Sequence, residues 1–147
     1  MKKVYIAGDH AAVEMKKELM AFIRTLGFEV ENFGTDTSDS VDYPVYAGKV
    51  ATAVQNDPDS LGVLICGTGI GMSLAANKYT GIRAAAVSEV FSAKMTREHN
   101  NSNIVCIGAR VIGIETAKMI VEAFLTTPFE GGERHVRRIS MIEGLAK

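Results

Sequence analysis

Cys66 and the glycine-rich turn that follows it are the part of this chain best suited to chemistry. Cys66 ends an apolar run that begins at Leu61, and residues 67–71 read Gly-Thr-Gly-Ile-Gly just before a helical pattern. Backbone N–H groups at a helix N-terminus bind anions and stabilise a cysteine thiolate. A thiolate here could act as a nucleophile or as a general base, whereas a buried structural cysteine would leave the same pattern.

The turn does not match two common phosphate-binding motifs. Met72 stands where a dinucleotide-binding turn has its third glycine, and no Gly-Lys-Ser/Thr follows as in a P-loop. A tight strand-to-helix turn with positive φ would also favour these glycines. The second cysteine, Cys106, lies inside the apolar run 104–107 and is interpreted as a structural core residue.

The three histidines each lie at a predicted element boundary. His10 follows Asp9 at a strand end, His99 precedes two asparagines, and His135 lies in a basic segment. None shows the spacing of metal ligands along the chain, so we expect no metal. The strand-end position makes His10 a candidate site residue, with a solvated or capping role as the alternative.

Three arginines, Arg134, Arg137 and Arg138, cluster within about one helical turn near the C-terminus. Guanidinium groups at this spacing suit a phosphate or a carboxylate. The alternative is a solvated basic helix start, although cations at a helix N-terminus are unfavourable with the helix dipole.

Composition excludes several classes of protein. The 147 residues include 16 Lys and Arg against 17 Asp and Glu, and a nucleic-acid binder would normally show a basic excess. The two cysteines form no CxxC pair, which favours reduced thiols. No apolar stretch approaches the ~20 residues that cross a bilayer. We therefore expect a soluble cytoplasmic domain spanning residues 1–147, with no nucleic-acid or membrane partner.

Short apolar runs alternate with helical periodicity, which is typical of parallel α/β proteins. The predicted strands are 3–7, 28–32, 61–66, 82–87 and 104–107. The predicted helices are 15–26, 44–55, 72–78, 88–99 (capped by Ser88), 114–125 and 134–146.

Ligands bind beyond the carboxyl ends of the strands in open α/β sheets. Asp9, Cys66 and Arg110 follow strands and therefore belong to that edge. His99 and Asn100 end a helix, which places them at the opposite edge of their own subunit.

Taken together, these residues resemble ribose-5-phosphate isomerase type B and its relatives, the galactose-6-phosphate isomerase subunits. The resemblance covers essentially the whole chain. It rests on the segments GDHA (8–11), SVDYP (40–44), ICGTGIGMS (65–73) with AANK (75–78), GIRA (81–84), REHN (97–100), GARVIG (108–113) and RHVRRI (134–139).

The resemblance implies a Rossmann-like αβα sandwich with a central five-stranded parallel sheet. It also implies a homodimer, or a tetramer built from it, with two active sites at the dimer interface and the helix 134–146 packed on the partner subunit. The implied reaction converts ribose 5-phosphate to ribulose 5-phosphate through a cis-enediolate, without metal or cofactor.

The resemblance also implies residue roles. Cys66 moves the proton between C1 and C2, Thr68 stabilises the enediolate, and His99, with Asp9 near it, assists opening of the sugar ring. The implied substrate-binding residues are His10, Tyr43, Gly67, Gly69, Ile70, Gly71, Asn100, Arg110, Arg134 and Arg138. We expect each site to combine Asp9, Tyr43 and residues 66–71 of one subunit with His99, Asn100, Arg134 and Arg138 of the other, and leave His10 and Arg110 unassigned.

Two departures within the family matter. One branch has a glutamate base where this chain has Met72, so the presence of Cys66 assigns the chain to the cysteine branch. In many members of the family an arginine follows the glycines directly, whereas here Glu133 stands between Gly132 and Arg134. Arg137 is therefore an alternative phosphate ligand.

Three rival functions remain at the level of sequence. Six-carbon substrates, galactose 6-phosphate or allose 6-phosphate, would need only a longer pocket. A second alternative is a tetrulose-phosphate isomerase of polyol breakdown. A phosphosugar- or nucleotide-binding module would have no need for a strand-end cysteine beside a threonine.

Overall fold

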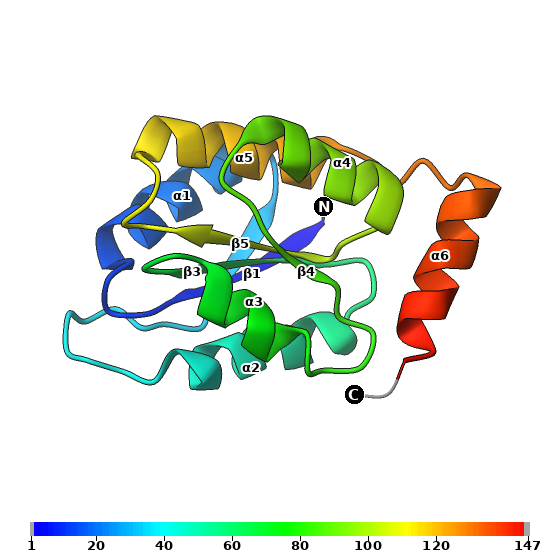
Figure 1. Cartoon of the computed structure of the whole chain (residues 1–147). Coiled ribbons are helices and arrows are strands. Elements are labelled where there is room, and N and C mark those ends of the chain that lie inside the picture. Colours follow the sequence, from blue (N-terminus) through cyan, green and yellow to red (C-terminus); the bar gives the residue numbers. More distant parts are fainter. Residues whose placement is uncertain (1, 146–147) are drawn as a thin grey trace.

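The apolar runs of the sequence form one parallel sheet (Figure 1). The computed structural model describes residues 2–145. Its strands are β1 (Lys3–Gly8), β2 (Glu29–Asn32), β3 (Leu61–Cys66), β4 (Ala84–Ala86) and β5 (Ile104–Gly108), in the order β2-β1-β3-β5-β4. The prediction of a Rossmann-like αβα sandwich with a central five-stranded parallel sheet is confirmed.

Strand β3 lies at the centre of the sheet because all six of its residues are apolar or glycine and all are buried. A parallel strand covered by helices on both faces requires such a run. The register pairs Gly8 with Ile65 on one side and Cys66 with Gly108 on the other. The carboxyl ends of β1, β3 and β5 therefore finish side by side, and the residues after them share one edge.

Helices cover both faces of the sheet (Figure 1). The helices are α1 (Val13–Thr25), α2 (Tyr43–Gln55), α3 (Ile70–Ala76), α4 (Val90–Asn100), α5 (Ile114–Thr126) and α6 (Glu133–Glu143). One core cluster joins the sheet to α1, α4 and α5 through buried residues such as Leu19 and Phe124. The second cluster joins the other face to α2 and α3 through residues such as Val50 and Met72. No described helix has both the length and the apolar character needed to cross a membrane.

Helix α6 stands apart from the two layers, beside the end of α4 (Figure 1). Its C-terminal end is held by an ion pair between Arg83 and Glu143. Several of its apolar side chains face solvent in the single chain, including Val136, Met141 and Ile142. Because exposed apolar side chains are unfavourable, these parts of α6 lack a covering surface among the described residues of the chain.

Some predicted boundaries were wrong. Ser88 does not cap α4; the cap is Glu89, whose extended backbone lets its carboxylate accept a hydrogen bond from the Ser92 N–H at 2.9 Å. This bond lowers the pKa of Glu89. Helix α3 begins at Ile70 rather than 72 and ends at Ala76.

The ends of two other elements also differ. Strand β4 (Ala84–Ala86) is shorter than the predicted 82–87; it lies at the edge of the sheet, paired with β5. Helix α6 begins one residue early, at Glu133, and ends at Glu143. The predicted helix end at residue 146 lies outside the described residues.

Candidate active site

Cys66 ends the central strand directly before the glycine turn. Its side chain is 5% exposed, and its Sγ accepts a hydrogen bond from the Gly69 N–H at 3.1 Å. Gly69 has φ +82°, in the left-handed region that favours glycine, as the sequence predicted for this turn. The turn therefore aims an N–H group at the sulfur, an arrangement that stabilises a thiolate.

The turn packs backbone against backbone on the end of β5. A Cβ at Gly108 would lie 2.7 Å from the backbone of Thr68, and a Cβ at Gly69 would lie 2.9 Å from the Ile107 carbonyl carbon. Only glycine permits this approach at both positions. The Thr68 Oγ1 accepts a hydrogen bond from the Ile70 N–H at 3.2 Å, which leaves its own hydrogen available to a ligand.

Asp9 and His10 follow β1 and lie at the same edge as Cys66. The Asp9 N–H donates to the Ile65 carbonyl at 3.0 Å, and its carboxylate accepts from the Ala11 N–H at 2.9 Å. His10 Nδ1 accepts a hydrogen bond from the Val41 N–H at 3.2 Å. Because Nδ1 accepts, the proton of the neutral ring is assigned to Nε2, which is then a donor suited to an anionic oxygen.

Tyr43 and Arg110 close two further sides of the turn. The Tyr43 ring lies against Gly71, where a Cβ would come within 2.6 Å of its Cζ atom. The Arg110 guanidinium lies over Gly67, 3.4 Å from the place of a Cβ, and the Arg110 N–H donates to the Gly67 carbonyl at 3.0 Å. The structure thus places His10 and Arg110, which the sequence left unassigned, on the Cys66 side of their own chain.

A buried lysine supports the loop that leads to Tyr43. Lys16 on α1 is 1% exposed; its Nζ donates to Asn32 Oδ1 at 2.8 Å and forms an ion pair with Asp36. The hydrogen bond from Lys16 lowers the pKa of Asp36. Sequence reasoning missed this support, and the available signal was a lysine among apolar residues at helical spacing.

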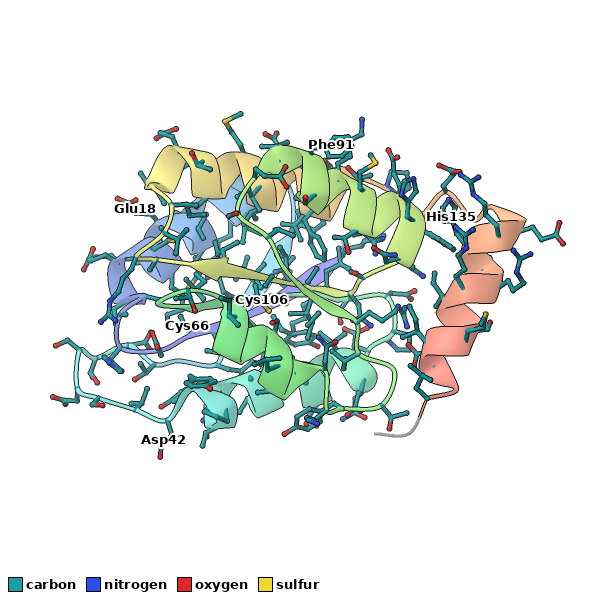
Figure 2. All side chains as sticks on the ribbon, in the orientation of Figure 1. Glu18, Asp42, Cys66, Phe91, Cys106 and His135 are labelled. Carbon is teal, nitrogen blue, oxygen red and sulfur yellow. The ribbon has the colours of Figure 1, made fainter. Side chains whose placement is uncertain are left out.

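The other expected site residues lie at the opposite edge of the chain. His99 and Asn100 close the last turn of α4, and Arg134 and Arg138 are exposed on α6. Figure 2 shows Cys66 and His135 far apart, at the two ends of the sheet. One chain therefore does not bring the two sets of expected site residues together.

The structure brings together two histidines that are far apart in sequence. The rings of His99 and His135 stack with centroids 4.4 Å apart and planes at 10°. With Glu130 they form a group whose ligand atoms lie within 4.8 Å of one another. Parallel stacked rings direct their lone pairs along parallel lines, so both can bind one ion only if the stack opens. The spacing argument could not reveal this contact, because it depends on how α6 packs.

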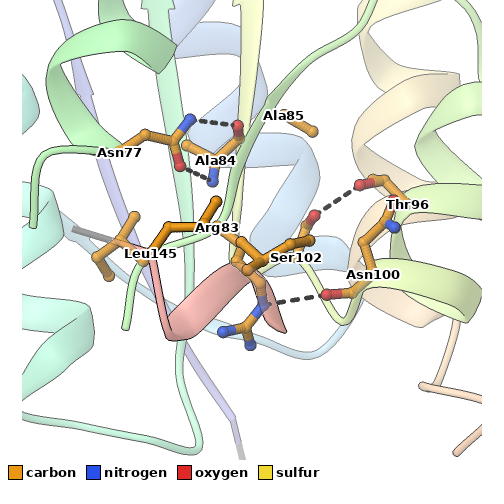
Figure 3. A pocket seen from close by; sticks show the side chains of 10 residues that line it. Asn77, Arg83, Ala84, Ala85, Thr96, Asn100, Ser102 and Leu145 are labelled. Carbon is orange, nitrogen blue, oxygen red and sulfur yellow. Dashed lines mark hydrogen bonds between the residues drawn. The ribbon is translucent and has the colours of Figure 1, made fainter. Parts of the chain in front are cut away.

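The cavity in Figure 3, of about 470 Å³, is separate from Cys66. It lies between β4, the end of α4 and the end of α6, and of the expected site residues it contains Asn100. Arg83 donates from Nε to the Asn100 carbonyl at 3.0 Å, and Asn77 bonds both backbone groups of Ala84. Its walls include Ile82, Ile142 and Leu145, and the Arg83 guanidinium in it is already bonded to the Asn101 carbonyl and to Glu143.

Cys106 is a core residue, as predicted. It is fully buried, and burial raises the pKa of its thiol well above the usual range. Met72 is also fully buried. Neither side chain has a place in the chemistry at the sheet edge.

Comparison with known proteins gives consistent results. The family model described as Ribose/Galactose Isomerase matches residues 4–142. Ribose-5-phosphate isomerase B of Escherichia coli is 46% identical over 145 residues, 99% of this chain and 97% of that protein. The D-erythrulose-4-phosphate isomerase of Pectobacterium atrosepticum is 40% identical over 90% of this chain and 88% of its own length. The ribose 5-phosphate isomerase structure from Thermotoga maritima superimposes with a TM-score of 0.93 at 48% identity, covering 98% of this chain and 99% of that one.

Proposed function

The chain belongs to the ribose/galactose isomerase family, and we propose that it interconverts ribose 5-phosphate and ribulose 5-phosphate by proton transfer. The observation that carries this proposal is the hydrogen bond from the Gly69 N–H to Cys66 Sγ, at a strand end lined by donors. Cys66 and Cys106 are both free thiols, which suits a reducing compartment. We therefore also propose that the protein is cytoplasmic.

The Cys66 thiolate takes the proton from C2 of the open-chain aldose. The electron pair left on C2 moves into a C1–C2 double bond, which gives an enediolate with the charge on O1. The proton of the C2 hydroxyl passes to O1, and Cys66 returns its proton to C1 as the C2 carbonyl forms, so no atom is gained or lost. Such a positioned base commonly contributes about 10²–10⁴ in rate.

The turn stabilises the charge that develops on the C1 and C2 oxygens. Its backbone N–H groups are fixed by the glycine contacts with β5, so they need not reorganise during the reaction. The Thr68 hydroxyl donates its available hydrogen to one of these oxygens. The substrate's sugar hydroxyls face Tyr43, whose ring borders the turn.

A complete site needs a second copy of the chain. We place Asp9, Tyr43 and residues 66–71 of one subunit opposite His99, Asn100, Arg134 and Arg138 of its partner. His99 then assists ring opening, and the arginines bind the phosphate together with His10 and Arg110 of the first subunit. A two-fold axis forms two such sites in one homodimer.

Exposed apolar side chains support this assembly. Ile70 and Leu74 of α3 are 57% and 64% exposed, and Met141 of α6 is 66% exposed. If α6 of one subunit packs on α3 of the other, both apolar surfaces are covered, and Arg134 and Arg138 approach the partner's turn. The same packing makes α6 part of the partner's site.

Tetrulose phosphate isomerisation is the second candidate, because the Pectobacterium relative named for erythrulose 4-phosphate is 40% identical. A coupled assay should compare ribose 5-phosphate with erythrulose 4-phosphate, galactose 6-phosphate and allose 6-phosphate. We expect the highest kcat/KM for ribose 5-phosphate. A higher value for another sugar phosphate would reassign the substrate, and no turnover of any of them would refute the isomerase proposal.

A further inference from the structure

His135 is in direct ring contact with the histidine expected to open the sugar ring. The centroids are 4.4 Å apart and the planes nearly parallel, at 10°. His99 is half-buried in the last turn of α4, so one face of its ring is covered by His135. A ring stacked on a fixed surface has fewer accessible χ2 values than one facing water, which restricts the direction of its nitrogen atoms.

His135 is itself held firmly. The residue is 6% exposed, and its backbone N–H donates to the Gly132 carbonyl at 3.0 Å in the first turn of α6. The connection before α6 is bonded to α4: the Glu130 N–H donates to the Glu98 carbonyl at 3.2 Å, and Arg97 Nε donates to the Thr127 carbonyl at 3.2 Å. The α4 end that carries His99 and the α6 start that carries His135 are therefore joined by backbone bonds as well as by the ring stack.

The polar atoms of His135 do not explain why a histidine lies there. Its Nε2 is buried without a hydrogen-bond partner, and the nearest carboxylate oxygen, of Glu130, is 4.0 Å away. Burial, followed by the charges of His99 and Arg134, lowers the pKa of His135. A neutral aromatic surface is what this residue presents to His99.

We infer that His135 is a positioning residue that acts through His99: its ring sets the orientation of the His99 imidazole relative to Arg134 and Arg138 on the same helix turn. This inference rests on the proposed function of His99. The phosphate and the ring oxygen of the substrate are a fixed distance apart, so the arginines and His99 must also be held at a fixed separation. The ring stack joins α6, which carries the arginines, to α4, which carries His99.

The test compares His135→Phe, which keeps the stacked ring, with His135→Ala, which removes it. In the full-length enzyme, His135→Ala should lower kcat for ribose 5-phosphate by roughly 10–100-fold with a smaller change in KM, as expected for misplacement of a reacting group. His135→Phe should keep kcat within about threefold of wild type. Equal losses in both variants would overturn the inference.

A control variant separates orientation of His99 from loosening of α6. Glu143→Ala removes the ion pair and the hydrogen bond with Arg83 at the other end of the helix and leaves the stack intact. It should therefore retain kcat. If it loses as much kcat as His135→Ala, the effect belongs to helix docking and the inference fails.

A spectroscopic readout tests the positioning without relying on activity. The ring protons of His99 should show an upfield ring-current shift in the ¹H–¹³C spectrum of wild type and His135→Phe, and this shift should disappear in His135→Ala. Unchanged His99 resonances in His135→Ala would overturn the inference.

The direction of the reaction separates failure of the inference from failure of the proposed function. Ribulose 5-phosphate cannot close a furanose ring because its O5 carries the phosphate, so the reverse reaction starts from an open chain. His135→Ala and His99→Ala should both lower kcat of the reverse reaction less than kcat of the forward reaction. If His99→Ala is fully active in both directions, the proposed role of His99 is wrong. The ring-current shift still tests whether His135 positions the His99 ring.

Discussion

The ring of Tyr43 lies so close to Gly71 that a Cβ at position 71 would come within 2.6 Å of the tyrosine Cζ. This contact joins the first residue of α2 to the turn after Cys66. It explains why the third glycine of the turn is needed even though its φ is not in the left-handed region. The first prediction follows from it.

Gly71→Ala should fold normally but bind substrate poorly. The added methyl meets the end of a side chain that is 38% exposed, so Tyr43 can move aside at little cost in stability. Its hydroxyl then leaves the substrate, and KM for ribose 5-phosphate should rise roughly tenfold while kcat changes less. Tyr43→Phe/Gly71→Ala, compared with each single variant, should show non-additive effects. Additive effects would mean that the two residues act separately.

Cys66→Ala should lower kcat by about 10²–10⁴ with substrate affinity within a few fold, because it removes the base alone. Cys106→Ala is the matched control: it removes a buried thiol of raised pKa and should keep kcat at a cost of about 1 kcal/mol in stability. Steady-state kinetics and iodoacetamide labelling check both. Ribose 5-phosphate should protect Cys66 from alkylation, and near wild-type kcat in Cys66→Ala would exclude it as the base.

Arg134→Ala and Arg138→Ala should each raise KM, by an amount equivalent to about 1.5–3 kcal/mol, the range for hydrogen bonds to charged groups. Arg138 is four positions and Arg137 three positions from Arg134 on α6, so they flank Arg134 on opposite sides of the same helix face. Arg137→Ala is the control and should have the smaller effect. A large effect at Arg137 with none at Arg138 would mean that Arg137, and not Arg138, binds the phosphate.

Mixing two inactive variants tests the shared site. Cys66→Ala and His99→Ala homodimers should both be nearly inactive, and a mixed dimer should have one intact site of two. Equal amounts unfolded and refolded together give about half mixed dimers by random pairing, so about a quarter of wild-type activity should return. No recovery, with subunit exchange demonstrated by mass spectrometry, would refute the shared site.

The burial of His135 predicts how stability depends on pH. Its folded-state pKa is lowered below the ordinary 6.5, first by desolvation, so the unfolded chain binds the proton more tightly. The stability that the neutral, buried His135 contributes is therefore present above about pH 6.5 and is lost as the pH falls below that value. Between about pH 7.5 and pH 5.5 the wild-type Tm should therefore fall more than the Tm of His135→Phe. An equal fall in both would show that His135 titrates normally.

The sequence by itself determined the parallel α/β architecture, the central place of Leu61–Cys66 and the position of Cys66 before a glycine turn. These features are local: hydrophobic periodicity indicates which segments are strands, and a strand whose residues are all apolar has to be covered on both faces. Asp9 and Cys66 share an edge because parallel strands end together. A helix that connects two parallel strands runs in the opposite direction to them. His99, near the C-terminal end of such a helix, therefore lies at the edge opposite Cys66.

Only the tertiary structure decided the contacts between segments that are distant in the chain. The stack of His99 on His135, the Arg83–Glu143 pair and the burial of Lys16 all depend on how helices pack at the sheet edges. The contact of the Arg110 guanidinium with Gly67 depends on how the ends of two neighbouring strands fit together. Such contacts have no periodic signal, because they are selected by shape and burial after the elements have formed.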